Sequence, residues 1–598
     1  MAASYLSKRN SATFIHCRRA MVYVARMITF SVSAAFLLVS VQTWTSFDEE
    51  SQADLVADTL MRIVENEFPA QTDVEFDEYQ LDVARSNAVP LDRSPPDVRP
   101  PACRQLIYQL DDLPDVSVIV PVFDESWSML LRALHGLVSR SPDRLLREII
   151  LVDDFSSRAY LKAPLDRYAA VLSSKIRIVR NDRREGLIRS RLTAARSAVG
   201  QVLVFLDSHV EVNHGWLLPL LDVIRRNWSR VVVPRVDSID PHSIDYVPWE
   251  RAAVGTLTWS MDYVWKLAPA ADETRPVPTA TTIGCALAVD RRFFFAVGAF
   301  DEGMSIWGGE NLELSVRAWT CAGGVHISPC SRVAHLFRRM LPYRVPTDSA
   351  GRSLKLRNYR RLVDVWLDDY RKYYYATESV RPLPVDAPDV DEVRSLDARR
   401  RLRRQLRCRG FDWYLHNVAT DLVAPVVNSR YFGQLQNAHG RTCAVSAPAH
   451  ALPVVECGWR DRSQTFALLQ NGTIVENRDR KCLTASVDGY AVLRPCSADA
   501  PSQIWTYDIF DSDTADDDVA KTVSTVRSSL EALDARKPMG KLSTIDEQNV
   551  TVCLTQVTSD HGLQVLGLMP CRGAGGNAFA ELFQYWLFTY RLDWTRVV

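Results

Sequence analysis

The chain has 598 residues, of which 47% are hydrophobic, and a formal net charge of −1. This length exceeds what a single hydrophobic core supports, so we expect two or more domains. The near-zero net charge is that of an ordinary globular protein and argues against bulk binding to nucleic acid.

The first long apolar segment, residues 27–47, contains no charged residue and has about the length that a helix needs to cross a bilayer. Basic residues precede it, and Asp48, Glu49 and Glu50 follow it. The positive-inside rule therefore predicts a cytosolic tail, residues 1–26, and a luminal position for the rest of the chain. A cleaved signal peptide is the alternative interpretation.

Cysteine usage agrees with a luminal position. Cys17 lies in the predicted tail, and the other cysteines follow the apolar segment, where an oxidising compartment favours pairing. Sequons begin at Asn227, Asn471 and Asn549 and could carry N-linked glycans there.

Residues 48–100 are acidic, end in a proline-rich run and lack apolar periodicity. We expect them to form a luminal stem that holds the folded domains away from the membrane.

From Val116 onward, short β-branched runs alternate with amphipathic segments. We expect strands over residues 116–120, 148–152, 176–179 and 202–206, and helices over residues 125–138 and 187–199. Such alternation predicts a parallel, doubly wound sheet, in which ligands bind at the carboxyl ends of the strands. Carboxylates follow three of these strands, at Asp124, at the pair Asp153-Asp154 and at Asp207.

The triplet Asp207-Ser208-His209 follows the apolar run 201–206. Side chains two residues apart project in the same direction from an extended chain, so Asp207 and His209 could hold a divalent metal ion. A metal ion at a strand end could in turn hold a nucleotide diphosphate. A surface turn without a ligand is the alternative interpretation.

A different pattern begins near Phe432, with short strands, many turns and paired cysteines. Each of three cysteine pairs is followed by a Gln-x-aromatic sequence, which ends at Phe466, Trp505 and Trp586. Three units of this kind predict an internal threefold repeat. An Asp-rich insert, residues 508–540, separates the second unit from the third.

Taken together, these segments resemble the polypeptide N-acetylgalactosaminyltransferases, the family that begins mucin-type O-glycosylation. The resemblance extends from about Cys103 to the C-terminus. It is carried by EIILVDDFS (148–156), RREGLIRSR (183–191), FLDSH (205–209), IWGGENLEL (306–314) and PCSRVAHLF (329–337).

The resemblance implies a single-pass type II membrane protein of the Golgi apparatus. It implies a tail at 1–26, a transmembrane signal anchor at 27–47, a stem at 48–100, an α/β GT-A (Rossmann-like) glycosyltransferase domain at 101–425 and an all-β ricin-type β-trefoil lectin domain at 430–598. The implied reaction transfers GalNAc from UDP-GalNAc to Ser or Thr hydroxyls of secretory polypeptides, with retention at the anomeric carbon. No side chain is an obvious covalent nucleophile, and the resemblance implies front-face attack, with the leaving phosphate accepting the hydroxyl proton.

Site residues follow from the resemblance position by position. Asp207, His209 and His335 resemble the ligands of a manganese ion, although His335 alone would more often be a core histidine. Asp154 and Arg184 resemble residues that hold the uridine.

The nucleotide site is further implied to include Gly186, whose backbone can approach the nucleotide closely, and Trp307. Arg338 and Tyr343 resemble side chains of a mobile loop that closes over the diphosphate; a solvated basic loop is the alternative.

Glu310 and Asn311 are assigned to the sugar and the reaction centre, and Gly284 to the donor-sugar segment. Trp259 and Phe337 resemble an aromatic platform for the acceptor peptide, though either could be an ordinary core residue.

The resemblance also implies five disulfides and leaves Cys285 without a partner. The implied pairs are Cys103–Cys330, Cys321–Cys408, Cys443–Cys457, Cys482–Cys496 and Cys553–Cys571.

The chain departs from the family pattern at several positions. Phe123-Asp124-Glu125 replaces the usual His-Asn-Glu, and Ile283-Gly284-Cys285-Ala286 replaces Ala-Gly-Gly-Leu, where the cysteine side chain could crowd the sugar pocket. Ser305 replaces an aspartate, and Leu341 stands where histidine is common.

The trefoil lacks the aspartate of the sugar-binding Cys-Leu-Asp triplet. The corresponding triplets end in Val445, Thr484 and Thr555. We expect the trefoil to fold but not to bind GalNAc in the usual way.

Three hypotheses follow. The intact set Asp207, His209 and His335, with Glu310, favours an active manganese-dependent GalNAc transferase. Cys285 and the missing lectin aspartates favour a transferase of the same fold with an altered donor or a glycopeptide-only acceptor preference. A catalytically impaired Golgi pseudoenzyme is the third.

Overall fold

The computed structural model describes residues 76–592 except 251, 269–272, 339, 341, 344–345, 348–352, 378–389, 439–441, 448–450, 458–461, 478, 510–538, 547, 549, 560–561 and 572–583. The predicted tail, the anchor at 27–47 and residues 48–75 lie outside this range. Among the described helices, none combines the length and the apolar character that a membrane crossing requires.

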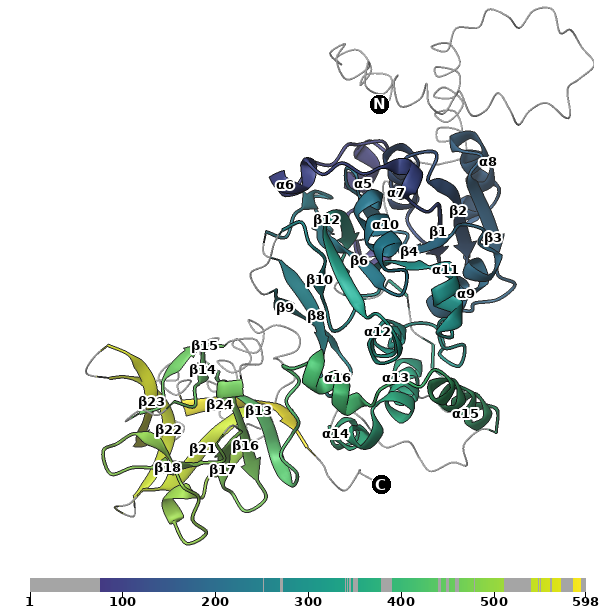
Figure 1. The fold of residues 1–598 in the computed structure, drawn as a ribbon. Coiled ribbons are helices and arrows are strands. Elements are labelled where there is room, and N and C mark those ends of the chain that lie inside the picture. The colour runs from purple at the N-terminus through teal and green to yellow at the C-terminus, as the bar shows by residue number, and fades with distance from the viewer. Residues whose placement is uncertain are drawn as a thin grey trace, which may run out of the picture. The chain divides into compact units, whose positions relative to one another are not determined.

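The chain forms two compact units, which interleave along the sequence (Figure 1). Unit 1 contains residues up to Thr256, then Tyr263–Trp366 and residues 388–410. Unit 2 contains Leu257–Asp262, residues 367–387 and Phe411–Val598. We expected a single division at residues 425–430. The interleaving arises because Trp259 packs against Tyr370, Tyr373 and Phe411 within unit 2.

Unit 1 is built on a ten-stranded sheet whose main order is β10-β12-β6-β11-β4-β1-β2-β3. Its strands are β1 (Val116–Val122), β2 (Leu146–Asp153), β3 (Ile176–Arg180), β4 (Val202–Leu206), β5 (Val210–Val212), β6 (Val231–Ile239), β7 (Tyr246–Val247), β10 (Val277–Pro278), β11 (Ala286–Asp290) and β12 (Val325–Leu336). A separate two-stranded sheet consists of β8 (Ala253–Leu257) and β9 (Tyr263–Leu267).

The sheet of unit 1 is mixed, so the expectation of a parallel sheet is only partly correct. Strands β3, β2, β1 and β4 are parallel neighbours, as predicted. However, β11 runs antiparallel to both β4 and β6. This inserted strand begins at Ala286, which pairs with Leu206 at the tip of β4, and the Asp207 N–H donates to the Cys285 carbonyl just before the strand. The pairing thereby brings Gly284 close to Asp207.

Helices cover the sheet of unit 1 (Figure 1). In α7 (Trp127–Arg140), Leu130, Leu134 and Leu137 recur at helical spacing and are fully buried. The other main helices are α8 (Ala163–Leu172), α9 (Leu187–Ser197), α10 (Leu217–Arg226), α11 (Arg291–Ala296), α12 (Glu310–Cys321), α13 (Leu354–Trp366) and α15 (Val390–Gln405).

Residues 76–100 are folded against unit 1, so the expectation of a stem that reaches residue 100 is wrong for this part. The segment forms α4 (Phe76–Tyr79) and α5 (Val83–Ala88), and α6 (Pro101–Arg104) follows. Tyr79, Leu81 and Val83 are buried. Arg93 binds both carboxylate oxygens of buried Glu211 at 2.6 and 2.9 Å. Burial of three apolar side chains and a charge pair holds the segment in place.

All five implied disulfides are present, which confirms these pairings. Unit 1 contains Cys103–Cys330 and Cys321–Cys408, and unit 2 contains the three pairs of the repeat. Cys285 is a free, buried cysteine.

The described residues of unit 2 are mainly β-strands, together with the helices α14 (Arg371–Ala376) and α16 (Phe411–Asn417) and three short 3-10 helices. Its strands are β13 (Ser429–Asn437), β14 (Thr442–Ala444), β15 (Val454–Glu456), β16 (Thr465–Leu469), β17 (Ile474–Glu476), β18 (Cys482–Ala485), β19 (Ala491–Arg494), β20 (Thr506–Ile509), β21 (Met539–Ile545), β22 (Thr551–Thr558), β23 (Gln564–Pro570) and β24 (Tyr585–Arg591). The pairing order is β19-β18-β17-β16-β13-β24-β21-β22-β23.

Equivalent hydrogen bonds confirm the threefold repeat of unit 2. The glutamines of the three Gln-x-aromatic sequences, Gln464, Gln503 and Gln584, each donate to the carbonyl that precedes the second cysteine of their repeat, at 3.1, 3.0 and 3.1 Å. Trp505 and Trp586 each donate to the leucine carbonyl of their own Cys-Leu-Thr triplet at 2.9 Å. The repeat therefore has a structural basis in buried polar contacts.

Candidate functional site

Asp207, His209 and His335 come together at the tips of β4 and β12. Asp207 follows β4 directly, and Leu336 on β12 donates its backbone N–H to the His209 carbonyl at 3.1 Å. His335 Nε2 lies 3.2 Å from Asp207 Oδ2, and the two imidazole rings are 4.8 Å apart. One ligand atom from each residue lies within 4.8 Å of the others, the pattern of a metal site.

The chemistry of these three side chains fits a divalent cation. Burial would raise the pKa of Asp207, but the hydrogen bond from His335 and the charge of Arg191 hold it below its usual value. Burial lowers the pKa of His335 to about 4, so its ring is neutral and can donate an electron pair at neutral pH. One carboxylate and two imidazoles suit Mn²⁺ and its first-row neighbours.

Glu125 is a site residue that the sequence reasoning missed. Its buried carboxylate accepts hydrogen bonds from His209 Nδ1 at 2.7 Å, Arg338 Nη2 at 2.6 Å and Ser208 Oγ at 3.0 Å. Burial would raise the pKa of Glu125, but the charge of Arg338 and the hydrogen bond from His209 hold it far below its usual range. Its position shortly after the first strand, in the segment Phe123-Asp124-Glu125, could have indicated this role.

Arg191 is a second residue that was missed, although it lies within the motif RREGLIRSR. Its side chain is 0% exposed. Arg191 Nη2 donates to Asp207 Oδ1 at 2.7 Å and to the Gly284 carbonyl at 2.9 Å. Arg191 therefore joins the metal-ligand cluster to the predicted donor-sugar segment.

Gly284, Glu310 and Asn311 meet on the other side of Arg191. A Cβ atom at Gly284, where φ is +95°, would lie 3.1 Å from Asn311 Cβ and 3.7 Å from Glu310 Oε1. Glu310 Oε2 accepts the Gly308 N–H at 2.9 Å, and burial raises the pKa of Glu310. The neighbouring Cys285 packs with the hydrophobic core of the sheet, and its backbone carbonyl accepts the Asp207 N–H at 3.0 Å.

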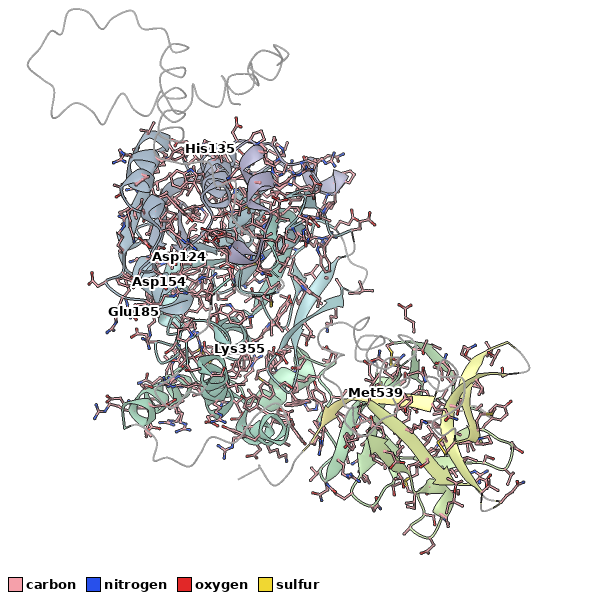
Figure 2. All side chains as sticks on the ribbon, turned by 180° about the vertical axis from the view of Figure 1, so that it is seen from behind. Asp124, His135, Asp154, Glu185, Lys355 and Met539 are labelled. Atoms are coloured by element: carbon pink, nitrogen blue, oxygen red, sulfur yellow. A yellow bond between two sulfur atoms is a disulfide. The ribbon has the colours of Figure 1, made fainter. Side chains whose placement is uncertain are left out.

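Asp154 orders the loop that carries Arg184. It accepts hydrogen bonds from Asn181 Nδ2 and from the backbone N–H groups of Glu185 and Gly186, each at 2.8 Å, and it pairs with Arg184. Asp124, Asp154 and Glu185 lie along one edge of unit 1 (Figure 2). The Asp154 carboxylate thus already accepts hydrogen bonds from groups of the protein itself. This leaves Arg184 as the group available to a ligand.

Arg184 lies beside two aromatic rings, Phe123 and Tyr343, which contact each other edge to face with their centroids 5.6 Å apart. Its guanidinium carbon is 3.3 Å from the centroid of Phe123 and 5.3 Å from that of Tyr343, a cation–π arrangement. Glycine at position 186 also has a structural role, in addition to allowing a ligand to approach the backbone closely. With φ at +86°, a Cβ atom there would lie 2.2 Å from Ile306 Cα, with which the glycine forms a backbone bridge.

The two aromatic residues predicted to form the acceptor platform differ in solvent exposure. Phe337 is 36% exposed, and its ring is 4.5 Å from that of His335. Trp259 is 0% exposed, and its Nε1 donates to the Val423 carbonyl at 2.7 Å. A ring buried in this way offers no face to a peptide, so the structure contradicts a platform role for Trp259. Trp307 is half-buried beneath Lys355.

Residues 117–292 match the Glycosyl transferase family 2 domain, and residues 268–339 match the domain described as N-terminal domain of galactosyltransferase. The crystal structure of GalNAc-T7 with UDP, GalNAc and Mn²⁺ superposes with a TM-score of 0.55 at 27% identity, covering 86% of this chain and 89% of that one. These matches confirm the predicted glycosyltransferase fold.

Two relatives are similar over most of this chain. Polypeptide N-acetylgalactosaminyltransferase 5 of Mus musculus is 39% identical over 412 residues, which cover 68% of this chain and 43% of the mouse protein. Probable N-acetylgalactosaminyltransferase 9 of Caenorhabditis elegans is 36% identical over 444 residues, which cover 72% of this chain and 75% of the nematode protein. The chain thus spans less than half the length of the mouse relative.

Proposed function

We propose that this chain, which belongs to the polypeptide N-acetylgalactosaminyltransferase family, transfers GalNAc from UDP-GalNAc to Ser or Thr hydroxyls of polypeptides with retention at the anomeric carbon. This reaction begins mucin-type O-glycans. One observation carries the proposal: Arg191 joins Asp207 of the metal-ligand cluster to Gly284, against which Glu310 and Asn311 are placed. The UDP, GalNAc and Mn²⁺ in the GalNAc-T7 structure support it.

Mn²⁺ would be held by Asp207, His209 and His335. Ligand atoms of a small octahedral cation lie about 3 Å apart, and the 3.2 Å between Asp207 Oδ2 and His335 Nε2 fits that spacing. When bound, the cation supplies positive charge that stabilises the departing diphosphate.

The chain's own contribution is positioning and charge rather than covalent catalysis. Glu310 is the carboxylate beside Gly284, and its raised pKa favours the neutral form, which is a poor nucleophile. We therefore favour front-face attack, in which the leaving phosphate accepts the hydroxyl proton. Arg338, held near His209 through Glu125, adds a positive charge on the phosphate side.

Arg184 and Tyr343 supply a stacked cation and an aromatic ring for the nucleotide, with Trp307 as a further contact. Phe337 supplies an exposed ring for the acceptor polypeptide beside the metal ligands.

Unit 2 is proposed to be a ricin-type β-trefoil that does not bind GalNAc in the usual way. At two of the three positions where the family has aspartate, this chain has threonine, whose hydroxyl forms hydrogen bonds within the protein. Thr484 Oγ1 donates to the Cys482 carbonyl at 3.1 Å and accepts from Gln503 at 3.1 Å. Thr555 Oγ1 makes the same two contacts with Cys553 and Gln584, at 3.0 and 3.3 Å. No carboxylate is available there to accept a hydrogen bond from a sugar.

The apolar segment 27–47 supports a location in the Golgi membrane with the catalytic part in the lumen. The five disulfides are typical of an oxidising compartment and agree with that location.

The test is a transfer assay with the full chain, made in a secretory host and purified in detergent. UDP-GalNAc, UDP-GlcNAc and UDP-Gal are compared on a library of Ser/Thr peptides and glycopeptides, with and without Mn²⁺. We expect Mn²⁺-dependent GalNAc transfer that Asp207→Asn abolishes. Transfer from another donor alone, or on glycopeptides alone, would support the altered-specificity hypothesis. A folded chain that binds no UDP would refute the enzyme proposal.

A further inference from the structure

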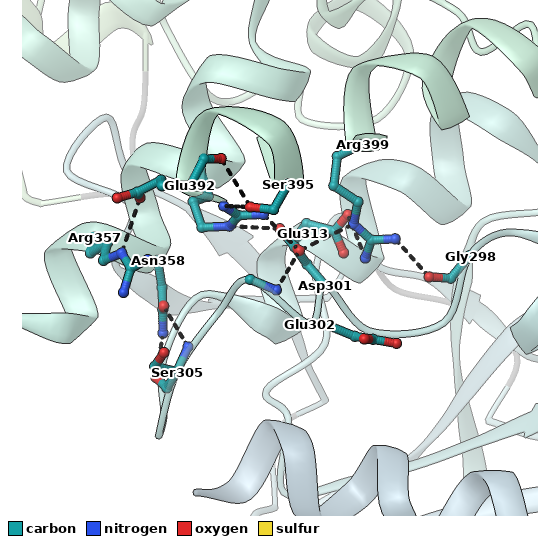
Figure 3. A network of polar contacts seen from close by, with 12 residues as sticks. Gly298, Asp301, Glu302, Ser305, Glu313, Arg357, Asn358, Glu392, Ser395 and Arg399 are labelled. Atoms are coloured by element: carbon teal, nitrogen blue, oxygen red, sulfur yellow. Dashed lines mark hydrogen bonds and ion pairs between the residues drawn. The ribbon is translucent and has the colours of Figure 1, made fainter. Parts of the chain in front are cut away.

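The side chain of Asn358 on α13 is 0% exposed and faces the loop that precedes α12. The Ser305 N–H donates to Asn358 Oδ1 at 2.9 Å. Asn358 Nδ2 donates to the Ser305 carbonyl (Figure 3) and to the Gly308 carbonyl, each at 2.9 Å. One side-chain amide therefore satisfies three backbone groups of this loop, which would otherwise be unpaired in the interior.

The loop held by Asn358 has a strained backbone, which needs contacts from neighbouring elements to keep its conformation. Ile306 has φ at +58°, which is rare for a β-branched residue, and Gly308 and Gly309 follow at +98° and +93°. Such a conformation persists only when the surroundings determine it. Gly186 contacts Ile306 from the nucleotide side through a backbone bridge, and Asn358 contacts the loop from α13.

Helix α13 also anchors the beginning of the loop. Arg361 lies three residues after Asn358, on the same face of the helix. It binds both carboxylate oxygens of Asp301 at 2.9 and 3.0 Å, and its Nη1 donates to Ser395 of α15 at 2.7 Å. Figure 3 labels the two partners of Arg361, Asp301 and Ser395, and marks contacts at both. The loop is therefore fixed at both ends by one rigid helix.

Gly308 links the contacts of Asn358 with the loop to Glu310 in the candidate reaction centre. Its carbonyl accepts from Asn358, while its N–H donates to the Glu310 carboxylate at 2.9 Å. A shift of Gly308 would therefore move Glu310, and with it Asn311 at the start of α12.

We propose that Asn358 is a positioning residue for the transfer reaction: it holds residues 305–309 so that Glu310 and Asn311 lie beside the donor-sugar segment at Gly284. This inference rests on the proposed function. The hydrogen bonds of Asn358 to this loop go to backbone groups, so Asn358 acts through the loop backbone.

The test compares Asn358→Asp, Asn358→Ser and a control in the full chain. Asn358→Asp keeps the shape but replaces the donor with an acceptor that repels the Ser305 and Gly308 carbonyls, and Asn358→Ser is the milder change. The control is Arg357→Gln, at the position next to Asn358, which breaks the Arg357–Glu392 pair at 3.0 Å.

Each protein is titrated with UDP and Mn²⁺ to count intact nucleotide sites, and kcat is expressed per site. We expect kcat per site to fall about 10- to 100-fold in Asn358→Asp, less in Asn358→Ser, and not in the control, because a displacement near 1 Å has effects of this size. A merely structural role would lower the number of sites and leave kcat per site unchanged, which would overturn the inference.

A second measurement does not depend on catalysis. Hydrogen–deuterium exchange of peptides that cover residues 303–310 should become faster in both Asn358 variants and remain unchanged in Arg357→Gln. Unchanged exchange in this segment would overturn the inference. Absence of GalNAc transfer in the unmodified chain, with faster exchange in the variants, would refute the proposed function but support the loop-holding role.

Discussion

His209 donates the hydrogen of its Nδ1 to the ionised carboxylate of Glu125, 2.7 Å away. This bond fixes the tautomer of the imidazole and leaves the lone pair of Nε2 available to a metal ion. The other oxygen of the same carboxylate accepts from Arg338 at 2.6 Å. One buried side chain thus orients a proposed metal ligand and holds the arginine that is proposed to face the diphosphate.

Glu125→Gln is expected to lower the affinity for Mn²⁺ by about 10-fold or more, because a neutral amide orients His209 less strongly. Electron paramagnetic resonance of free Mn²⁺ measures this directly. Glu302→Gln is the matched control, since Glu302 is exposed and pairs only with Arg196 in the described structure. Equal affinities in the two variants would contradict the assigned role of Glu125.

Arg184→Ala is expected to lower UDP affinity by about 10-fold, because the stacked cation beside Phe123 and Tyr343 is lost. Isothermal titration calorimetry with UDP and Mn²⁺ measures the change. Arg183→Ala is the control, since this neighbouring arginine is largely exposed and pairs with Glu185. If both variants bind UDP equally, Arg184 is not a nucleotide contact.

Leu81→Ala is expected to lower the free energy of unfolding by about 2–5 kcal/mol, because it leaves a cavity where residues 76–100 pack on unit 1. Denaturant titration of the full chain provides the value. Ile107→Ala removes a side chain that is 87% exposed and should have little effect. A similarly small effect of Leu81→Ala would mean that the segment behaves as a loose stem.

Stability is expected to decrease as the pH falls from about 6.5 to about 4. Burial, together with the charge of Arg230, lowers the pKa of His326 to about 4, from an ordinary value of 6.5. The unfolded chain therefore binds a proton at a higher pH than the folded one, so the stabilisation is complete above pH 6.5 and is lost towards pH 4. His326 contributes up to about 3 kcal/mol to this loss.

Unfolding of His326→Phe over this pH range tests the assignment. Its stability should depend less steeply on pH than that of the unmodified chain, whereas His416→Gln, which replaces an exposed histidine, should retain the full slope. An unchanged slope in His326→Phe would contradict a neutral, buried His326.

Local sequence patterns were sufficient for several elements. The apolar run over residues 202–206 coincides with β4, and the run that begins at Val116 forms β1, because an uninterrupted β-branched segment of this length is buried on both faces of a sheet. The Asp207–His209 pair could be proposed from the same reasoning, since residues two apart share a side of an extended chain. The pairing of the cysteines and the place of His335 came from the family resemblance.

The antiparallel insertion of β11 and the folding of residues 76–100 were not predicted. Neither has a local signature: the direction of a strand depends on the path of the chain before it, and the few apolar residues near Leu81 show no period. The burial of Trp259 was likewise unpredictable, because the rings that enclose it, Tyr370, Tyr373 and Phe411, lie more than 100 residues further along the chain.

By itself, then, the sequence determined which strands deliver carboxylates to the sheet edge, and it determined the threefold repeat, because both depend on short-range periodicity. Only the tertiary structure decided what surrounds those groups. Glu125, Arg191 and Asn358 act on residues 84, 93 and 53 positions away in the chain. Hydrogen bonds over such separations exist only after the sheet and its helices have packed, so the tautomer of His209, the environment of Asp207 and the shape of the loop before Glu310 are properties of the folded chain.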